Sequence, residues 1–193
     1  MAAPHDDSRD ELLKTGAAGI GTGILTPLLQ PLIDHMNGSP GDVRIALLAV
    51  PFAILVLVLI QFDSNNPRWA APAGAVVTMI AFVWAVDSAV WIDGQITASE
   101  RAVRNVLSGL AGGFVGSGVM ALGISLLPAG PRDPLAWLPM LVIGTSAGAL
   151  LALDNALNLD LTSALYPVWQ AGVAICLAMA LRRVKPSRSR GQA

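Results

Sequence analysis

The sequence predicts an all-α integral membrane protein of about six transmembrane helices, built around a duplicated helical hairpin. Three observations support this prediction. Hydrophobic residues make up 54% of the 193 residues and charged residues only 13%, about half the charged share of a soluble domain. Six stretches are long and apolar enough to cross a hydrocarbon core, which needs roughly 20 residues per helix. One distinctive residue pattern also occurs twice along the chain.

The composition excludes several classes of protein. So few charges rule out a disordered chain, a nucleic-acid-binding protein and an ordinary soluble enzyme. Twelve basic and thirteen acidic residues nearly cancel, so no overall field attracts an anionic macromolecule. The single cysteine, Cys176, excludes an intramolecular disulfide and a cysteine-cluster metal site. We therefore expect the lipid bilayer to be the main partner and expect no nucleic-acid partner.

The candidate spans differ in clarity. The second is the clearest, because residues 45–60 form an unbroken apolar run whose only irregularity is Pro51. The first is the weakest, because Pro27 and Pro31 fall in its second half; it either spans with a kink or forms a re-entrant segment. The six candidates are residues 16–33, 44–61, 70–92, 105–127, 135–153 and 161–181.

Lysine and arginine in short loops set the orientation of a membrane protein. With six spans, nine basic residues fall on one side and three on the other, which predicts cytoplasmic termini and a multi-pass protein of the cell membrane. The preference for Arg over Lys, with many Ala and Gly, favours a bacterial inner membrane. The chain then divides into a polar cytoplasmic N-terminus (1–15), a transmembrane domain (16–183) and a basic cytoplasmic tail (184–193).

The most specific signal is an internal repeat. Residues 85–93 (AVDSAVWID) align with residues 152–160 (ALDNALNLD), and a Pro-Arg pair precedes each segment. The alignment predicts that a hairpin over residues 44–93 is duplicated as residues 105–160, in a parallel arrangement. The alternative is a chance similarity between two membrane helices rich in small residues.

The repeated segments carry polar stripes, because positions three, four and seven apart share one face of a helix. An ionised carboxylate at the centre of a membrane helix costs on the order of 2.5–3.5 kcal/mol, so Asp87 is expected to face the bundle interior or a water-filled cavity. Alternatively the helix ends at Val86 and Asp87 is a solvated loop residue. The predicted polar or cation site comprises Asp87, Ser88, Asp154, Asn155 and Asn158.

Acidic residues gather on the side predicted to be outside. Asp34, Asp93 and Asp160 follow the expected outward ends of three helices, which predicts an acidic mouth that concentrates cations. Converging carboxylates would offer the hard oxygen ligands that Ca²⁺ or Mg²⁺ prefers, although the sequence does not identify a metal. The alternative is that the positive-inside rule merely permits acids on this side.

Glycines spaced four apart predict close packing of helices, because absent side chains let two backbones approach in lipid. Self-association and a pore lined by glycine backbone are the alternatives. The residues concerned are Gly109, Gly112, Gly113 and Gly116 in the fourth span, and Gly144 and Gly148 in the fifth.

No catalytic or cofactor-binding motif is present, so we expect no enzyme and no cofactor. Two hypotheses for the function remain. The first is a cation or small-solute permeation or binding protein that uses intramembrane carboxylates near an acidic outer mouth. The second is a non-transporting membrane anchor or subunit that packs through glycine-rich helix faces against a partner or in a homo-oligomer.

Overall fold

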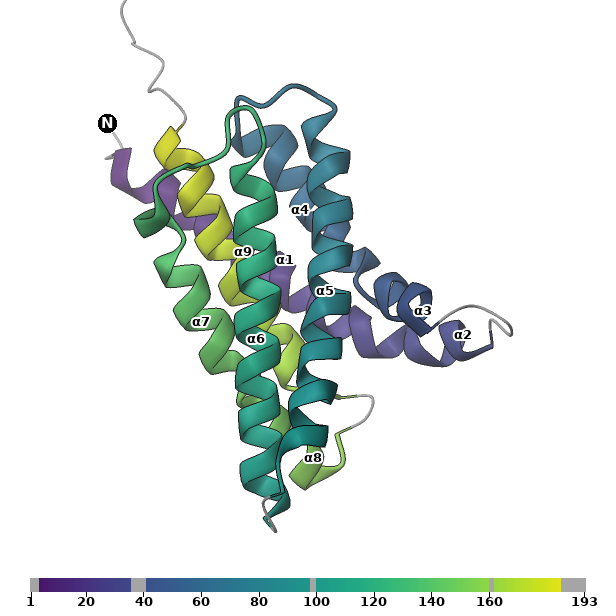
Figure 1. Cartoon of the computed structure of the whole chain (residues 1–193). Helices are drawn as coiled ribbons and strands as arrows, with labels where there is room; N and C mark the ends of the chain where they lie inside the picture. The colour runs from purple at the N-terminus through teal and green to yellow at the C-terminus, as the bar shows by residue number, and fades with distance from the viewer. Residues whose placement is uncertain (1–3, 36–40, 98–99, 160–161, 185–193) are drawn as a thin grey trace, which may run out of the picture.

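A computed structural model describes residues 4–35, 41–97, 100–159 and 162–184, and these residues form helices without any strand (Figure 1). The all-α prediction is therefore confirmed for the described part of the chain. The elements are α1 (Pro4–Leu28), α2 (Gln30–Asp34), α3 (Gly41–Leu48), α4 (Val50–Asp63), α5 (Ala70–Gln95), α6 (Arg101–Ser125), the 3-10 helix η1 (Pro134–Ala136), α7 (Leu138–Gly148), α8 (Leu150–Leu157) and α9 (Leu165–Val184).

Five helical stretches among the described residues are long and apolar enough to cross a membrane, and a bent pair of helices makes a sixth if it counts as one span. This number agrees with the predicted one. Proline positions explain two of the three divisions, those before α2 and before α4, because proline lacks the N–H that would continue the hydrogen-bond ladder. The stretches are Ser8–Asp34, α5, α6, Leu138–Leu157 and α9, and the bent pair is α3 with α4.

The prediction that residues 44–61 form the clearest span is corrected in one respect, because this run is not a straight helix. α3 and α4 meet at Ala49 with a bend of 54°. Pro51 lies in the first turn of α4, where it removes a donor and its ring clashes with the carbonyl four residues earlier. The first span, with Pro27 and Pro31, nevertheless continues from α1 into α2 as one candidate span.

The helices pack as a bundle around the antiparallel pair of α5 and α6, which have the most extensive contact. On one side α6 packs against α7 and α8, and α9 lies against both α7 and α1. α4 completes the bundle against α5. α1 tilts across the bundle, so that α2 and α3 form an arm to one side of α5 (Figure 1). The start of α1 and the end of α9 lie at one end of the bundle, and the end of α5 lies at the other.

One row of α6 glycines lies against α7 and α8. A Cβ atom added at Gly109 would overlap the carbonyl oxygen of Gly148, and one added at Gly113 would overlap that of Gly144. These backbones therefore approach more closely than any other residue would allow. The row fixes α8 beside the first half of α6.

The other row of α6 glycines lies against α5. A Cβ atom at Gly112 would lie 2.8 Å from the carbonyl oxygen of Ala85, and one at Gly116 would lie 2.9 Å from the Ala85 side chain. Since both contacts are with Ala85, this side of α5 is the one covered by α6. The two rows together place α6 between its neighbours inside the same chain.

The two hairpins proposed as a duplication are both antiparallel, but they are divided at different places. In the first hairpin the break at Ala49 lies in the first arm, between α3 and α4. In the second hairpin α6 is continuous and the break at Ala149 lies in the second arm, between α7 and α8. The duplication stays a prediction from the sequence.

Arg182 links three helices at the end of the bundle that holds the start of α1. Its Nη2 atom lies 3.1 Å from Oε2 of Glu11 on α1 and 3.2 Å from Oδ2 of Asp63 on α4. Deeper in the bundle, the Nε2 amide of Gln170 on α9 donates to Oγ1 of Thr26 on α1 at 2.8 Å, where both residues are buried. α9 is thus joined to α1 by polar contacts as well as by packing.

Candidate functional site

A polar cavity of about 450 Å³ lies between α5, α6 and α8, at the end of the bundle opposite the start of α1. Charged and amide side chains supply most of its chemistry. Because several of these side chains are exposed, the cavity opens to the surface. Its lining consists of Ala89, Val90, Asp93, Arg101, Arg104, Asn105, Ser108, Leu151, Asn155 and Asn158.

Helical spacing explains why these residues meet. Those of α6 that line the cavity begin at Arg101 and recur three, four and seven positions later, so they form one stripe on the first two turns of the helix. On α8 the lining residues Leu151 and Asn155 are likewise four positions apart, and Asn158 follows as the C-terminal cap of this helix. The contact of Gly109 with Gly148 holds the two stripes together across the cavity.

The cavity lining contains two arginines and one aspartate. Nε of Arg104 lies 2.8 Å from Oδ1 of Asp93 on α5, and this pair neutralises one of the two arginines. Among the described residues no ion pair engages Arg101. Both arginines occupy the first turn of α6, which contains no acidic residue, although the positive end of the helix dipole favours negative charge there. The lining of the cavity therefore carries one more positive than negative charge, while acidic Glu100, the N-cap of α6, lies outside the lining.

Asn158, one of the lining residues, has an unusual backbone conformation. It is the C-terminal cap of α8, with φ 52° and ψ 48°, in the left-handed region that asparagine tolerates better than most residues. Its backbone N–H donates to the carbonyl oxygen of Asp154. The helix therefore ends here, and the chain turns back toward α9.

Asp154 is buried, but outside the polar cavity, and its carboxylate is used within the fold. It is 8% exposed. Oδ2 accepts a hydrogen bond from Oγ of Ser163 at 2.5 Å, and Oδ1 accepts one from the backbone N–H of Ala164 at 2.8 Å. The N–H of Leu165, the first residue of α9, also donates to Oδ2, at 3.3 Å. This arrangement serves the same purpose as an N-cap, because it satisfies free N–H groups at a helix start.

Asp87 is exposed, which corrects the prediction that it faces the bundle interior. The helix does continue beyond Val86, so the alternative of a loop residue is also wrong. Glycines of α6 cover the side of α5 that carries Ala85, and a residue two positions further along a helix points to the other side. No hydrogen bond or ion pair of the Asp87 carboxylate is found among the described residues.

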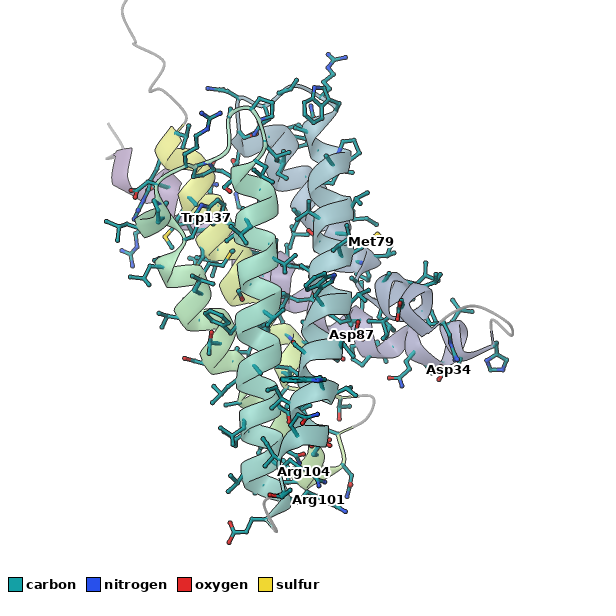
Figure 2. All side chains as sticks on the ribbon, viewed as in Figure 1. Asp34, Met79, Asp87, Arg101, Arg104 and Trp137 are labelled. Atoms are coloured by element: carbon teal, nitrogen blue, oxygen red, sulfur yellow. The ribbon has the colours of Figure 1, made fainter. Side chains whose placement is uncertain are left out.

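The two described acids of the predicted outer mouth, Asp34 and Asp93, do not converge. Asp34 lies on the α2–α3 arm, apart from Arg101 and Arg104 at the start of α6 (Figure 2). It pairs with Arg44 at 2.5 Å, while Asp93 belongs to the polar cavity. Asp160 lies outside the described residues. Within the described ranges no group of three His, Cys, Asp or Glu side chains is placed to hold a metal ion.

The predicted polar site is therefore divided. Asn155 and Asn158 line the cavity, but Asp87, Ser88 and Asp154 do not. The Ser88 hydroxyl donates to the carbonyl oxygen of Ala85 within its own helix, at 3.0 Å. Sequence reasoning missed the α6 stripe, whose signal is the spacing of four polar residues just before a glycine-rich segment. These residues are Arg101, Arg104, Asn105 and Ser108.

Comparison with known proteins gives no relative from which a role could be transferred. No protein-family model matches this chain, and neither does any curated protein or any solved structure. The polar cavity is therefore interpreted from its own geometry and charge.

Proposed function

We propose that this chain is an integral membrane protein that binds a small solute through an anionic group in the polar cavity. The observation that carries the proposal is the charge imbalance of the cavity. Two arginines face one aspartate, and no ion pair within the described residues engages Arg101. An anion would neutralise this excess and would also interact favourably with the positive end of the α6 dipole.

The side chains of the cavity suit a carboxylate or a phosphate group. A guanidinium presents N–H donors in a planar fork that matches two oxygens of such a group. Arg101 supplies the fork, and the amides of Asn155 and Asn158 provide further donors on the opposite wall. The pairing of Arg104 with Asp93 fixes the third wall. Arg101 thus provides the positive charge, and the two asparagines provide additional hydrogen-bond donors, for one anionic group.

This proposal keeps the small-solute hypothesis and replaces the cation with an anion. The two acids proposed for a cation site, Asp87 and Asp154, do not line the cavity. The carboxylate of Asp154 already accepts three hydrogen bonds. Since the polar lining lies at one end of the bundle, the geometry favours binding over conduction across the full length of the helices.

The test is a titration of inorganic phosphate into the protein in nanodiscs of zwitterionic lipid, followed by calorimetry. Arg101→Gln should weaken binding by about tenfold or more, because it removes a charge-assisted hydrogen bond. Arg68→Gln is the matched control, since Arg68 is also exposed but precedes α5 at the opposite end of the bundle. Absence of phosphate binding, or equal binding by the two variants, would contradict the proposal.

A second function, assembly as a membrane subunit, is favoured by the outward face of α5. Asp87 is about 7 Å along the helix from the midpoint of α5, so a centred α5 would hold it within a hydrocarbon core of about 30 Å. Trp84 and Trp91, 59% and 63% exposed, lie on the same stripe. Such a carboxylate normally faces a partner, and indole N–H groups of a second copy could supply donors.

Sedimentation of the detergent-solubilised protein tests this second function. The wild type should form a dimer and Asp87→Leu should shift toward the monomer, because the substitution removes the acceptor at the interface. Asp42→Leu is the matched control, since Asp42 is an exposed acid on α3. A monomeric wild type, or a dimer that Asp87→Leu leaves intact, would exclude association through this face.

A further inference from the structure

An apolar cavity of about 240 Å³ continues inward from the polar one. The two cavities share Ala89, Val90 and Leu151 in their linings. Along α5 the combined lining runs from Asp93 to Phe82, which is about 16 Å of helix. A charged opening thus leads directly into an apolar groove that is directed toward the middle of the bundle.

Close contacts between helix backbones determine the shape of this groove. Its floor contains Gly109, Gly112 and Gly148, whose approach to one another and to α5 leaves no room for an added Cβ at Gly109 or Gly148. Tyr166 lines the far wall, and its ring stacks on Phe82 with centroids 5.8 Å apart. Glycine has no side chain that could rotate into the groove, so its shape is set by the packing of α6 against its neighbours.

We propose that the two cavities form one site for an amphiphile with an anionic head and a single apolar chain. This inference rests on the proposed function, because Arg101 would hold the head. The chain would pass Val90 and Leu151 and lie over the glycine floor toward Tyr166. The order of the two cavities matches the way an amphiphile sits in a bilayer, with its charge near the surface and its chain toward the middle. An anion without an apolar chain would fill only the polar cavity.

The experiment compares inorganic phosphate with butyl, octyl and dodecyl phosphate, using the protein in zwitterionic nanodiscs and empty nanodiscs to subtract partitioning. Octyl phosphate should bind about tenfold more tightly than inorganic phosphate. The gain in affinity per methylene should stay below the roughly fourfold expected for transfer out of water, because the bilayer also offers the chain apolar surroundings. Octylammonium should not bind, since the site selects an anion. An anionic lysophospholipid, which also has one chain, should compete with octyl phosphate when it is added to the nanodiscs; absence of competition would exclude a single-chain membrane lipid as the ligand.

A pair of matched variants separates the groove from the head site. Val86→Trp places a large ring inside the apolar groove, because Val86 lines the groove on α5 but does not line the polar cavity. It should abolish the gain from the chain and leave phosphate binding unchanged. Val76→Trp, on the same helix, 55% exposed and outside both linings, should behave as wild type.

Three results would overturn the inference. Equal affinity of the wild type for inorganic and octyl phosphate would mean that the outer cavity binds anions while the groove plays no part. Equal binding of octylammonium and octyl phosphate would mean that the head is not selected. If the gain from the chain survives Val86→Trp, the chain lies elsewhere. Absence of binding by every phosphate would instead remove the proposed function itself.

Discussion

The two helices that carry the repeated pattern place their aspartates in opposite surroundings. On α8, Asp154 is 8% exposed and its carboxylate accepts three hydrogen bonds. On α5, Asp87 is exposed and has no such partner among the described residues. The chain that follows explains the difference. α8 ends three residues after Asp154 and the chain folds back to begin α9 beside it, whereas α5 continues for two more turns to Gln95.

This comparison shows that an aspartate within an apolar helix acquires its role from the donors that the later chain brings to it. The residue pattern around the aspartate is the same in both segments. Only in the second does the following chain bring backbone N–H groups, those of Ala164 and Leu165, to the carboxylate. In the first segment the neighbouring helix covers the alanine side and leaves the acid outside. Three substitutions test the comparison.

The largest effect is expected for Asp154→Ala. It removes the acceptor for Ser163 and for two backbone N–H groups at the start of α9. The loss of the cap and of charge-assisted hydrogen bonds should lower the free energy of unfolding by about 2–3 kcal/mol. Denaturant unfolding in detergent measures this, with Asp154→Asn expected to retain part of the stability. An Ala variant as stable as the wild type would show that the carboxylate does not support α9.

A smaller effect is expected for Ser163→Ala. The substitution removes one of the three donors and leaves the two backbone N–H groups on the carboxylate. We expect a loss of about 1 kcal/mol, the typical contribution of one hydrogen bond. Combined with Asp154→Ala, it should add almost nothing, because the acceptor is already gone. If the two losses add in full in the double variant, the hydroxyl and the carboxylate do not act on each other.

The smallest effect, and of opposite sign, is expected for Asp87→Leu in the detergent-solubilised protein. A carboxylate without partners in the described chain contributes little to the fold, and an apolar replacement resembles the exposed apolar residues beside it, Trp84 and Trp91. The melting temperature should be unchanged or higher by a few degrees. A marked decrease in a variant that sediments like the wild type would mean that Asp87 makes a stabilising contact within the chain, and that the two aspartates are more alike than their burial indicates.

Much of the helical architecture follows from the sequence, because apolar stretches of sufficient length predict where helices lie. The bend at Ala49 was less predictable, since a proline can be tolerated or can break a helix depending on what packs around it. The candidate site was predicted only in part. Asn155 and Asn158 were identified from the repeat, but the sequence does not show that Arg101 and Arg104 face them. That juxtaposition depends on which glycine row of α6 meets which helix.

The packing of α9 against α1 has a consequence for how the protein is made. Gly19 and Gly23 of α1 lie directly against the backbone of Ala171 and Pro167 on α9, and Thr26 bonds to a residue 144 positions later. At about 5–20 residues per second, the ribosome needs roughly 7–30 seconds to supply this partner. Throughout that interval α1 presents its glycine face to whatever surrounds the nascent chain, and the bundle closes only when its last helix arrives.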